Sequence, residues 1–145
     1  MNVPNLRSPY AQLGGIYYVA RMLDKIRLHE AGQLPEDFQA NLGKGFDSRA
    51  VNFLRIEYPA IVERVKQGGR DEEILAWCFE QGRKPDDEEI EIWNEFMRKR
   101  GWDDEATPTL LRRLKEGGFD ARTDIRTMFD YIDIDEGRDP ALKQG

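Results

Sequence analysis

Four ionisable side chains near the N-terminus recur at helical spacing. They are Arg21, Asp24, Lys25 and His29, which lie three or four positions apart, and this spacing places side chains along one side of an α-helix. Such a group could move a proton, with Lys25 or His29 as the transferring group and Asp24 tuning its pKa. A solvated helix face with one or two ion pairs gives the same pattern and is more common. The sequence leaves both interpretations open.

A second group of charges lies near the C-terminus. Four carboxylates fall within seven residues, at Asp130, Asp133, Asp135 and Glu136, and Arg138 follows them. Oxygen ligands of this kind suit Ca²⁺ or Mg²⁺. The spacing fails as an EF-hand loop, however, because position six, counted from Asp133, is Arg138 where the loop requires glycine. We therefore expect no metal site, and predict that the carboxylates contact basic groups of the same chain or are solvated at a helix end.

The two groups of charges are predicted to meet. Arg21 and Lys25 are four positions apart, and Asp130 and Asp133 are three apart, so each pair occupies one face of a helix. Both faces flank apolar stripes that must be buried, and helices that pack by these stripes bring their flanks together. We expect ion pairs between the two faces, or a charged cleft that they line.

A basic segment follows in the second half of the chain. Arg98, Lys99 and Arg100 precede Trp102, and three further basic residues follow at Arg112, Arg113 and Lys115. Basic groups interleaved with an aromatic ring can hold phosphate or nucleic acid, but cations at the end of a helix are also favoured by its dipole. Because the whole chain carries a net charge of -6, we expect no nucleic-acid partner.

Cysteine and histidine are too rare for most metal and redox chemistry. Cys78 and His29 are single occurrences, so an internal disulfide and a zinc site of the usual type are excluded. Cys78 lies between Trp77 and Phe79, which predicts a buried, unreactive thiol. The chain has no Walker loop, no GxGxxG and no nucleophile elbow. We expect no cofactor.

Apolar periodicity predicts an all-α fold, a single compact bundle of about seven helices joined by short turns. Residues 1–13 are expected to be extended, residues 32–46 to form a loop that could hold a weak hairpin, and no strand is convincing elsewhere. The predicted helices run from Ile16 to Ala31, from a cap at Asp47 to Leu54, from Pro59 to Val65, from Asp71 to a stop at Gly82, from Asp87 to a stop at Gly101, from Asp104 to Glu116, and from a cap at Thr123 through Ile132.

One stretch of sequence repeats. Residues 71–77 recur as residues 87–93, sixteen positions on, with an acidic first turn and a tryptophan three residues after an isoleucine. We predict consecutive antiparallel helices in which Trp77 and Trp93 occupy matching core positions.

The chain is expected to form one helical domain over residues 1–138, with a flexible tail at 139–145. No apolar run approaches the length needed to cross a bilayer, and the N-terminus has no signal-peptide pattern. Together with the scarcity of cysteine, these features favour a cytoplasmic protein without a membrane partner.

Several motifs resemble those of a known family. They are Arg7-Ser8-Pro9, Leu23-Asp24-Lys25, and the Asp-x-x-Asp-x-Asp-Glu-Gly-Arg stretch at 130–138. The chain resembles, over most of residues 7–138, a family of small bacterial proteins catalogued as a domain of unknown function. The resemblance implies a cytoplasmic bacterial protein and transfers no activity.

Two classes of function remain. We favour a non-enzymatic binding or protein-interaction module, which could be a homodimer. The alternative is an enzyme or small-molecule binder with a charged pocket between the N-terminal helix and the C-terminal acidic segment. A deep pocket walled by Arg21, Lys25 and Asp133 would favour the alternative. A flat apolar patch at a two-fold contact would favour the module.

Overall fold

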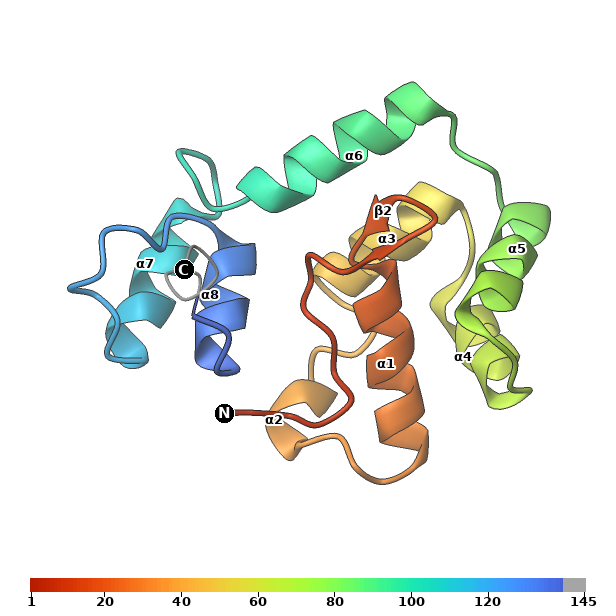
Figure 1. The fold of residues 1–145 in the computed structure, drawn as a ribbon, viewed down its shortest axis with the longest axis horizontal. Helices are drawn as coiled ribbons and strands as arrows, with labels where there is room; N and C mark the ends of the chain where they lie inside the picture. Colours follow the sequence, from red (N-terminus) through yellow and green to blue (C-terminus); the bar gives the residue numbers. More distant parts are fainter. Residues whose placement is uncertain (140–145) are drawn as a thin grey trace.

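A computed structural model describes residues 1–139 and shows a mainly helical protein (Figure 1). The all-α prediction is confirmed, with the addition of one small sheet. Of the predicted tail, residues 140–145 lie outside the described residues. None of the described helices combines the length and apolar character that a bilayer crossing requires. The helices are α1 (Val19–Glu30), α2 (Glu36–Gln39), α3 (Phe46–Leu54), α4 (Tyr58–Lys66), α5 (Asp71–Gln81), α6 (Asp87–Lys99), α7 (Thr107–Glu116) and α8 (Met128–Asp135).

The small sheet is a hairpin whose second strand lies where apolar periodicity predicts the start of a helix. Strand β1 (Gln12–Leu13) pairs antiparallel with β2 (Ile16–Tyr17). Gly14 and Gly15 form the turn with φ of 59° and 77°, and two positive φ angles in a two-residue turn favour glycine. Ile16 extends the apolar stripe of α1 because it is buried in the same core, so periodicity alone assigned it to the helix. Strands of two residues are too short to show an alternating pattern.

Several helix boundaries also differ from the prediction. The loop at 32–46 contains the one-turn helix α2 and no hairpin. Asp47 lies inside the first turn of α3 and does not cap it. The cap of α8 is Thr127, whose hydroxyl accepts a hydrogen bond from the Asp130 amide at 3.2 Å, and not Thr123. Several residues near each helix start are able to cap the helix. The local sequence does not show which of them does so, and the predicted boundaries are therefore displaced.

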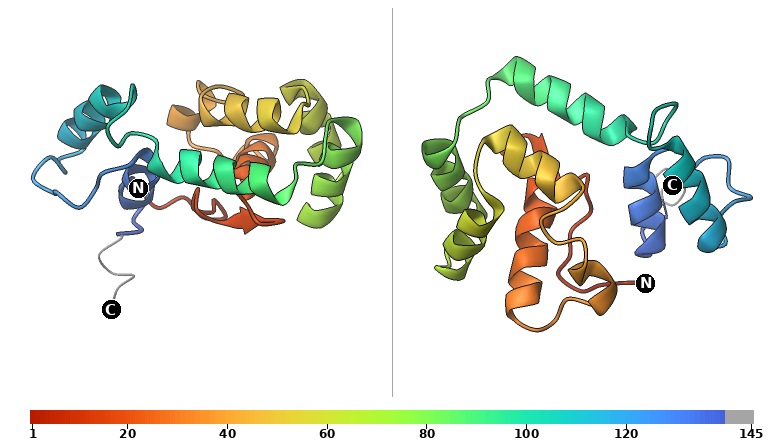
Figure 2. Two further views of the ribbon diagram at one scale, coloured as in Figure 1. Left: turned by 90° about the horizontal axis from the view of Figure 1, so that it is seen from above. Right: turned by 180° about the vertical axis from the view of Figure 1, so that it is seen from behind.

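Helix α1 lies between the α4–α5 pair and the α7–α8 pair (Figure 1 and Figure 2). The main core surrounds α1, and α8 enters it through Phe129, whose ring meets Tyr10 and Phe46 edge to face. A second apolar cluster joins α7 to α8. Helix α6 leaves α5 and runs across the molecule to contact β2 and α8. The predicted antiparallel packing of the two repeat helices is therefore wrong.

The two tryptophans of the repeat do not occupy matching positions. Trp93 is buried, stacks on Phe53 with ring centroids 4.5 Å apart, and donates a hydrogen bond to the Tyr17 carbonyl at 3.0 Å. Trp77 is half-buried at the edge of the main core. The repeat specifies two similar helices but not similar surroundings for them.

Candidate functional site

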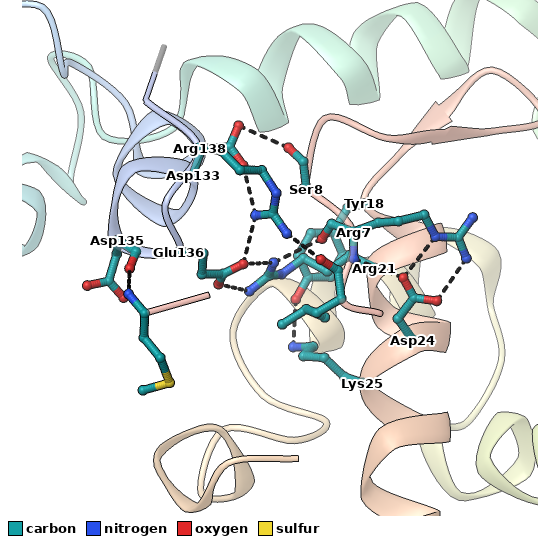
Figure 3. Close-up of polar contacts among 12 residues, drawn as sticks. Arg7, Ser8, Tyr18, Arg21, Asp24, Lys25, Asp133, Asp135, Glu136 and Arg138 are labelled. Carbon is teal, nitrogen blue, oxygen red and sulfur yellow. Dashed lines mark hydrogen bonds and ion pairs between the residues drawn. The ribbon is translucent and has the colours of Figure 1, made fainter. Parts of the chain in front are cut away.

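A network of buried charges joins α1 to the N-terminal segment and to the turn that follows α8 (Figure 3). The N-terminal segment is held against the end of α1 by a small apolar cluster, and this cluster fixes the position of the residues that come next, Arg7 and Ser8. The members of the cluster are Val3, Leu6, Leu28 and Leu34.

Arg21 lies at the centre of the network and pairs with Glu136. Its two terminal nitrogens donate to the two carboxylate oxygens at 2.8 and 2.6 Å, and Nη1 also donates to the Arg7 carbonyl at 3.0 Å. Both side chains are buried. Burial alone would lower the pKa of Arg21, but the hydrogen bonds and charge of Glu136 outweigh it and raise the pKa. Arg21 therefore carries its positive charge at neutral pH.

Arg138 extends the network on the C-terminal side. Its Nη1 lies 2.8 Å from Glu136 and 3.3 Å from Asp133, and its Nη2 donates to the Leu6 carbonyl. Asp133 is fully buried and accepts a hydrogen bond from the Ser8 hydroxyl at 3.0 Å. The end of α8 is therefore held to the N-terminal segment by charge-assisted hydrogen bonds.

Asp24 and Lys25, adjacent on α1, have different partners. Arg7 donates to both oxygens of Asp24 through Nε at 2.8 Å and Nη2 at 2.9 Å. The same arginine reaches Asp71 at the start of α5, and Arg27 contacts both carboxylates. This cluster fixes α5 against α1, and the Asp24 carboxylate accepts hydrogen bonds from Arg7.

Lys25 pairs with Asp47 of α3, a residue for which the sequence predicts only a helix-capping role. Its ammonium lies 2.7 Å from Asp47 and donates to the Tyr18 hydroxyl at 2.9 Å, and Tyr18 in turn donates to Asp47 at 2.6 Å. Asp47 also accepts from the Gly43 amide at 3.0 Å. Burial lowers the pKa of Lys25 although Asp47 opposes this, and burial raises the pKa of Tyr18. No feature of the sequence distinguishes Asp47 from an ordinary acidic residue in the first turn of a helix.

The predicted pairing of Arg21 and Lys25 with Asp130 and Asp133 is wrong in its partners. Asp130 instead accepts a hydrogen bond from the Tyr10 hydroxyl at 2.8 Å. Glu136 caps the end of α8 and turns toward α1, a position that depends on where the helix ends and not on the spacing of charges.

Two of the predicted site residues contribute no side chain to the network among the described residues. His29 is exposed in the last turn of α1. Asp135 takes part through its backbone carbonyl, which accepts a hydrogen bond from the amino group of Met1. The remaining six predicted residues are Arg21, Asp24, Lys25, Asp130, Asp133 and Arg138, and all of them engage buried or half-buried partners.

An open recess of about 570 Å³ borders the network. Its volume lies within the range of small-molecule sites. Arg21, Lys25 and Asp133 do not line it. Within residues 1–139, no three acidic, histidine or cysteine side chains are grouped so as to hold a metal ion. The lining residues are Asn5, Leu6, Arg7, Ser8, Asp24 and Arg138.

Comparison with known families gives one match, which spans residues 3–138 and thus nearly the whole described chain. The chain belongs to the DUF5069 family. The family is described as a domain of unknown function, so the resemblance noted from the motifs is confirmed and brings no activity with it. No curated protein matches the chain.

Proposed function

We propose that this DUF5069 protein is a cytoplasmic, non-enzymatic binding module whose recess takes a small anion. The observation that carries the proposal is that Arg7 and Arg138 line the same recess. Their side chains are 40% and 25% exposed, so a ligand can reach them. Guanidinium groups bind carboxylate and phosphate through paired hydrogen bonds, which makes these groups the favoured ligand chemistry.

The charge of the recess supports a ligand with one negative group. The lining includes two arginines and one aspartate, Asp24. Arg7 uses Nε and Nη2 for Asp24 and Asp71, while its Nη1 has no partner within the described part of the chain. A bound anion would complete the hydrogen bonding of Arg7 without displacing either carboxylate.

The position of the acid–base groups supports binding over catalysis. Tyr18, Lys25 and Asp47 have the chemistry of a proton-transfer group, yet all three are buried and none lines the recess. A ligand would meet Arg7, Ser8 and Arg138 instead. The single cysteine suits a reducing compartment, which supports the cytoplasmic location.

Titration of the backbone amide signals by NMR tests this proposal, with inorganic phosphate and succinate as probes. We expect saturable shifts for residues 5–8 and 138. Arg7→Lys keeps the charge but loses the planar fork, so it should weaken binding several-fold. Arg112→Gln changes an exposed arginine of α7 that is remote from the recess lining and should leave binding unchanged. Two results would refute the proposal. One is signal shifts next to every arginine of the protein, and the other is shifts at residues 5–8 and 138 that Arg7→Lys leaves unchanged.

A further inference from the structure

The outer face of α6 exposes two large apolar side chains one turn apart. Ile92 is 61% exposed and Phe96 is 40% exposed. Exposed Glu88 precedes them by one turn and exposed Lys99 follows by one turn, so the four side chains form one stripe along the helix. Helix α6 lies along an edge of the molecule in Figure 1 and in the right-hand view of Figure 2. Isolated apolar residues on a surface are ordinary, but these two lie one helical turn apart on the same face of α6.

The charges that flank these two apolar residues are separated by sign. The first turns of α6 carry Asp87, Glu88 and Glu91, whereas its C-terminal end carries three cations, Arg98, Lys99 and Arg100, against one acid, Glu95, which pairs with Arg98 and Lys99. A further cation, Arg49, reaches the same end from α3. The guanidinium carbons of Arg49 and Arg100 lie 5.0 and 5.6 Å from the Phe96 ring centroid, where cations interact favourably with the ring face. The stripe is therefore acidic, then apolar, then basic.

We infer that this face of α6 pairs with the same face of a second copy of the chain, antiparallel across a two-fold axis between Ile92 and Phe96. A two-fold interface requires a surface that complements itself. In this arrangement Ile92 packs on the partner's Phe96, and Glu88 faces the partner's Lys99 and Arg100. A parallel arrangement would instead place like charges together, so the order of charges along α6 selects the antiparallel one. The inference is independent of the recess and its ligand.

The first experiment measures the mass of the native protein by sedimentation equilibrium. We expect a reversible dimer at concentrations on the order of 100 μM, as for a small interface. Phe96→Asp should make the protein monomeric. Leu111→Asp is the matched control, because Leu111 is 60% exposed on α7 and lies outside the stripe, and it should leave the dimer intact. Circular dichroism of each variant checks that the fold is retained.

The second experiment tests the direction of pairing by charge reversal. Glu88→Lys alone places lysine opposite lysine, and Lys99→Glu alone places glutamate opposite glutamate, so each variant should dissociate. An equimolar mixture restores both attractive pairs in a mixed dimer and should associate. A wild-type protein that stays monomeric, including one whose α6 face binds a different protein, would overturn the inference. So would a dimer that survives Phe96→Asp, or charge variants that fail to associate when mixed.

Discussion

Arg21 and Glu136 are 115 positions apart in the sequence and form a two-pronged ion pair, with both side chains buried. Taking two charges out of water is costly, and only close geometry with further hydrogen bonds offsets that cost. The Arg7 carbonyl and the Arg138 guanidinium supply those bonds. The pair therefore determines how the end of α8 docks on α1.

Removal of one partner of this pair should be strongly destabilising. We expect Glu136→Ala to lower the free energy of unfolding by about 3–5 kcal/mol, because it leaves the Arg21 charge buried without a counter-charge. Glu116→Ala is the control, since it breaks the exposed Arg112–Glu116 pair of α7 and should change stability little. Urea unfolding measures both, and equal losses would contradict the importance of burial.

The two tryptophans of the repeat should differ in their effect on stability. Trp93→Ala removes a buried ring that stacks on Phe53, so we expect a loss of about 3–5 kcal/mol. Trp77→Ala should cost clearly less, because Trp77 is half-buried. Thermal or urea unfolding of the two variants decides the matter, and a larger loss for Trp77→Ala would show that the assigned surroundings are wrong.

The stability of the protein should fall in acid through Asp71. Burial raises the pKa of Asp71, but hydrogen bonds from Arg27 and Arg7 lower it more, so the pKa lies below its usual value. A carboxylate whose pKa is lower in the folded state than in the unfolded state stabilises the folded state. This stabilisation is complete above the unfolded-state pKa of about 4, and it is lost as the pH falls through the folded-state pKa.

Asp71→Asn tests this dependence. The difference in unfolding free energy between wild type and variant should stay constant from about pH 7 to pH 5 and shrink below about pH 4. Urea unfolding at each pH measures it. A difference that persists unchanged at pH 2 would show that the carboxylate charge is not what stabilises this corner of the fold.

Cys78 should be unreactive in the folded protein. Its side chain is fully buried in the main core, and burial raises the pKa of the thiol to about 12. The thiolate is the reactive form, so we expect a chromogenic disulfide reagent at pH 8 to react on the order of a thousandfold more slowly than with the urea-unfolded chain. Rapid labelling without urea would place Cys78 at the surface.

The helices were predictable from sequence because their signals are local. Leu110 and Leu114 share one face of α7 and are both buried, and Gly82 ends α5. Gly82 is tightly packed as well, since a Cβ atom at this position would lie 1.9 Å from the Leu54 carbonyl oxygen. Periodicity and helix-ending residues depend only on near neighbours, which a sequence displays directly.

The partners of the buried charges were not predictable in the same way. Asp133, Asp135 and Glu136 lie close together in the sequence, and charge alone cannot decide which of them reaches Arg21. The choice depends on the residue at which α8 ends and on the side of α1 that it packs against. Asp47 was overlooked because an aspartate in a first helical turn satisfies the dipole wherever its side chain points. Tertiary packing decides both cases.

The distance between Arg21 and Glu136 along the chain also affects how the protein is made. At roughly 5–20 residues per second, the ribosome completes Glu136 roughly 6 to 23 seconds after Arg21. Throughout that interval the nascent chain carries an arginine whose counter-charge does not yet exist, so α1 cannot settle into its final surroundings. We therefore expect the docking of α8 on α1 to be a late step of folding, which begins only once Glu136 has left the ribosome. Prematurely terminated chains that lack the end of α8 should be recognised by the cell as unfinished and degraded.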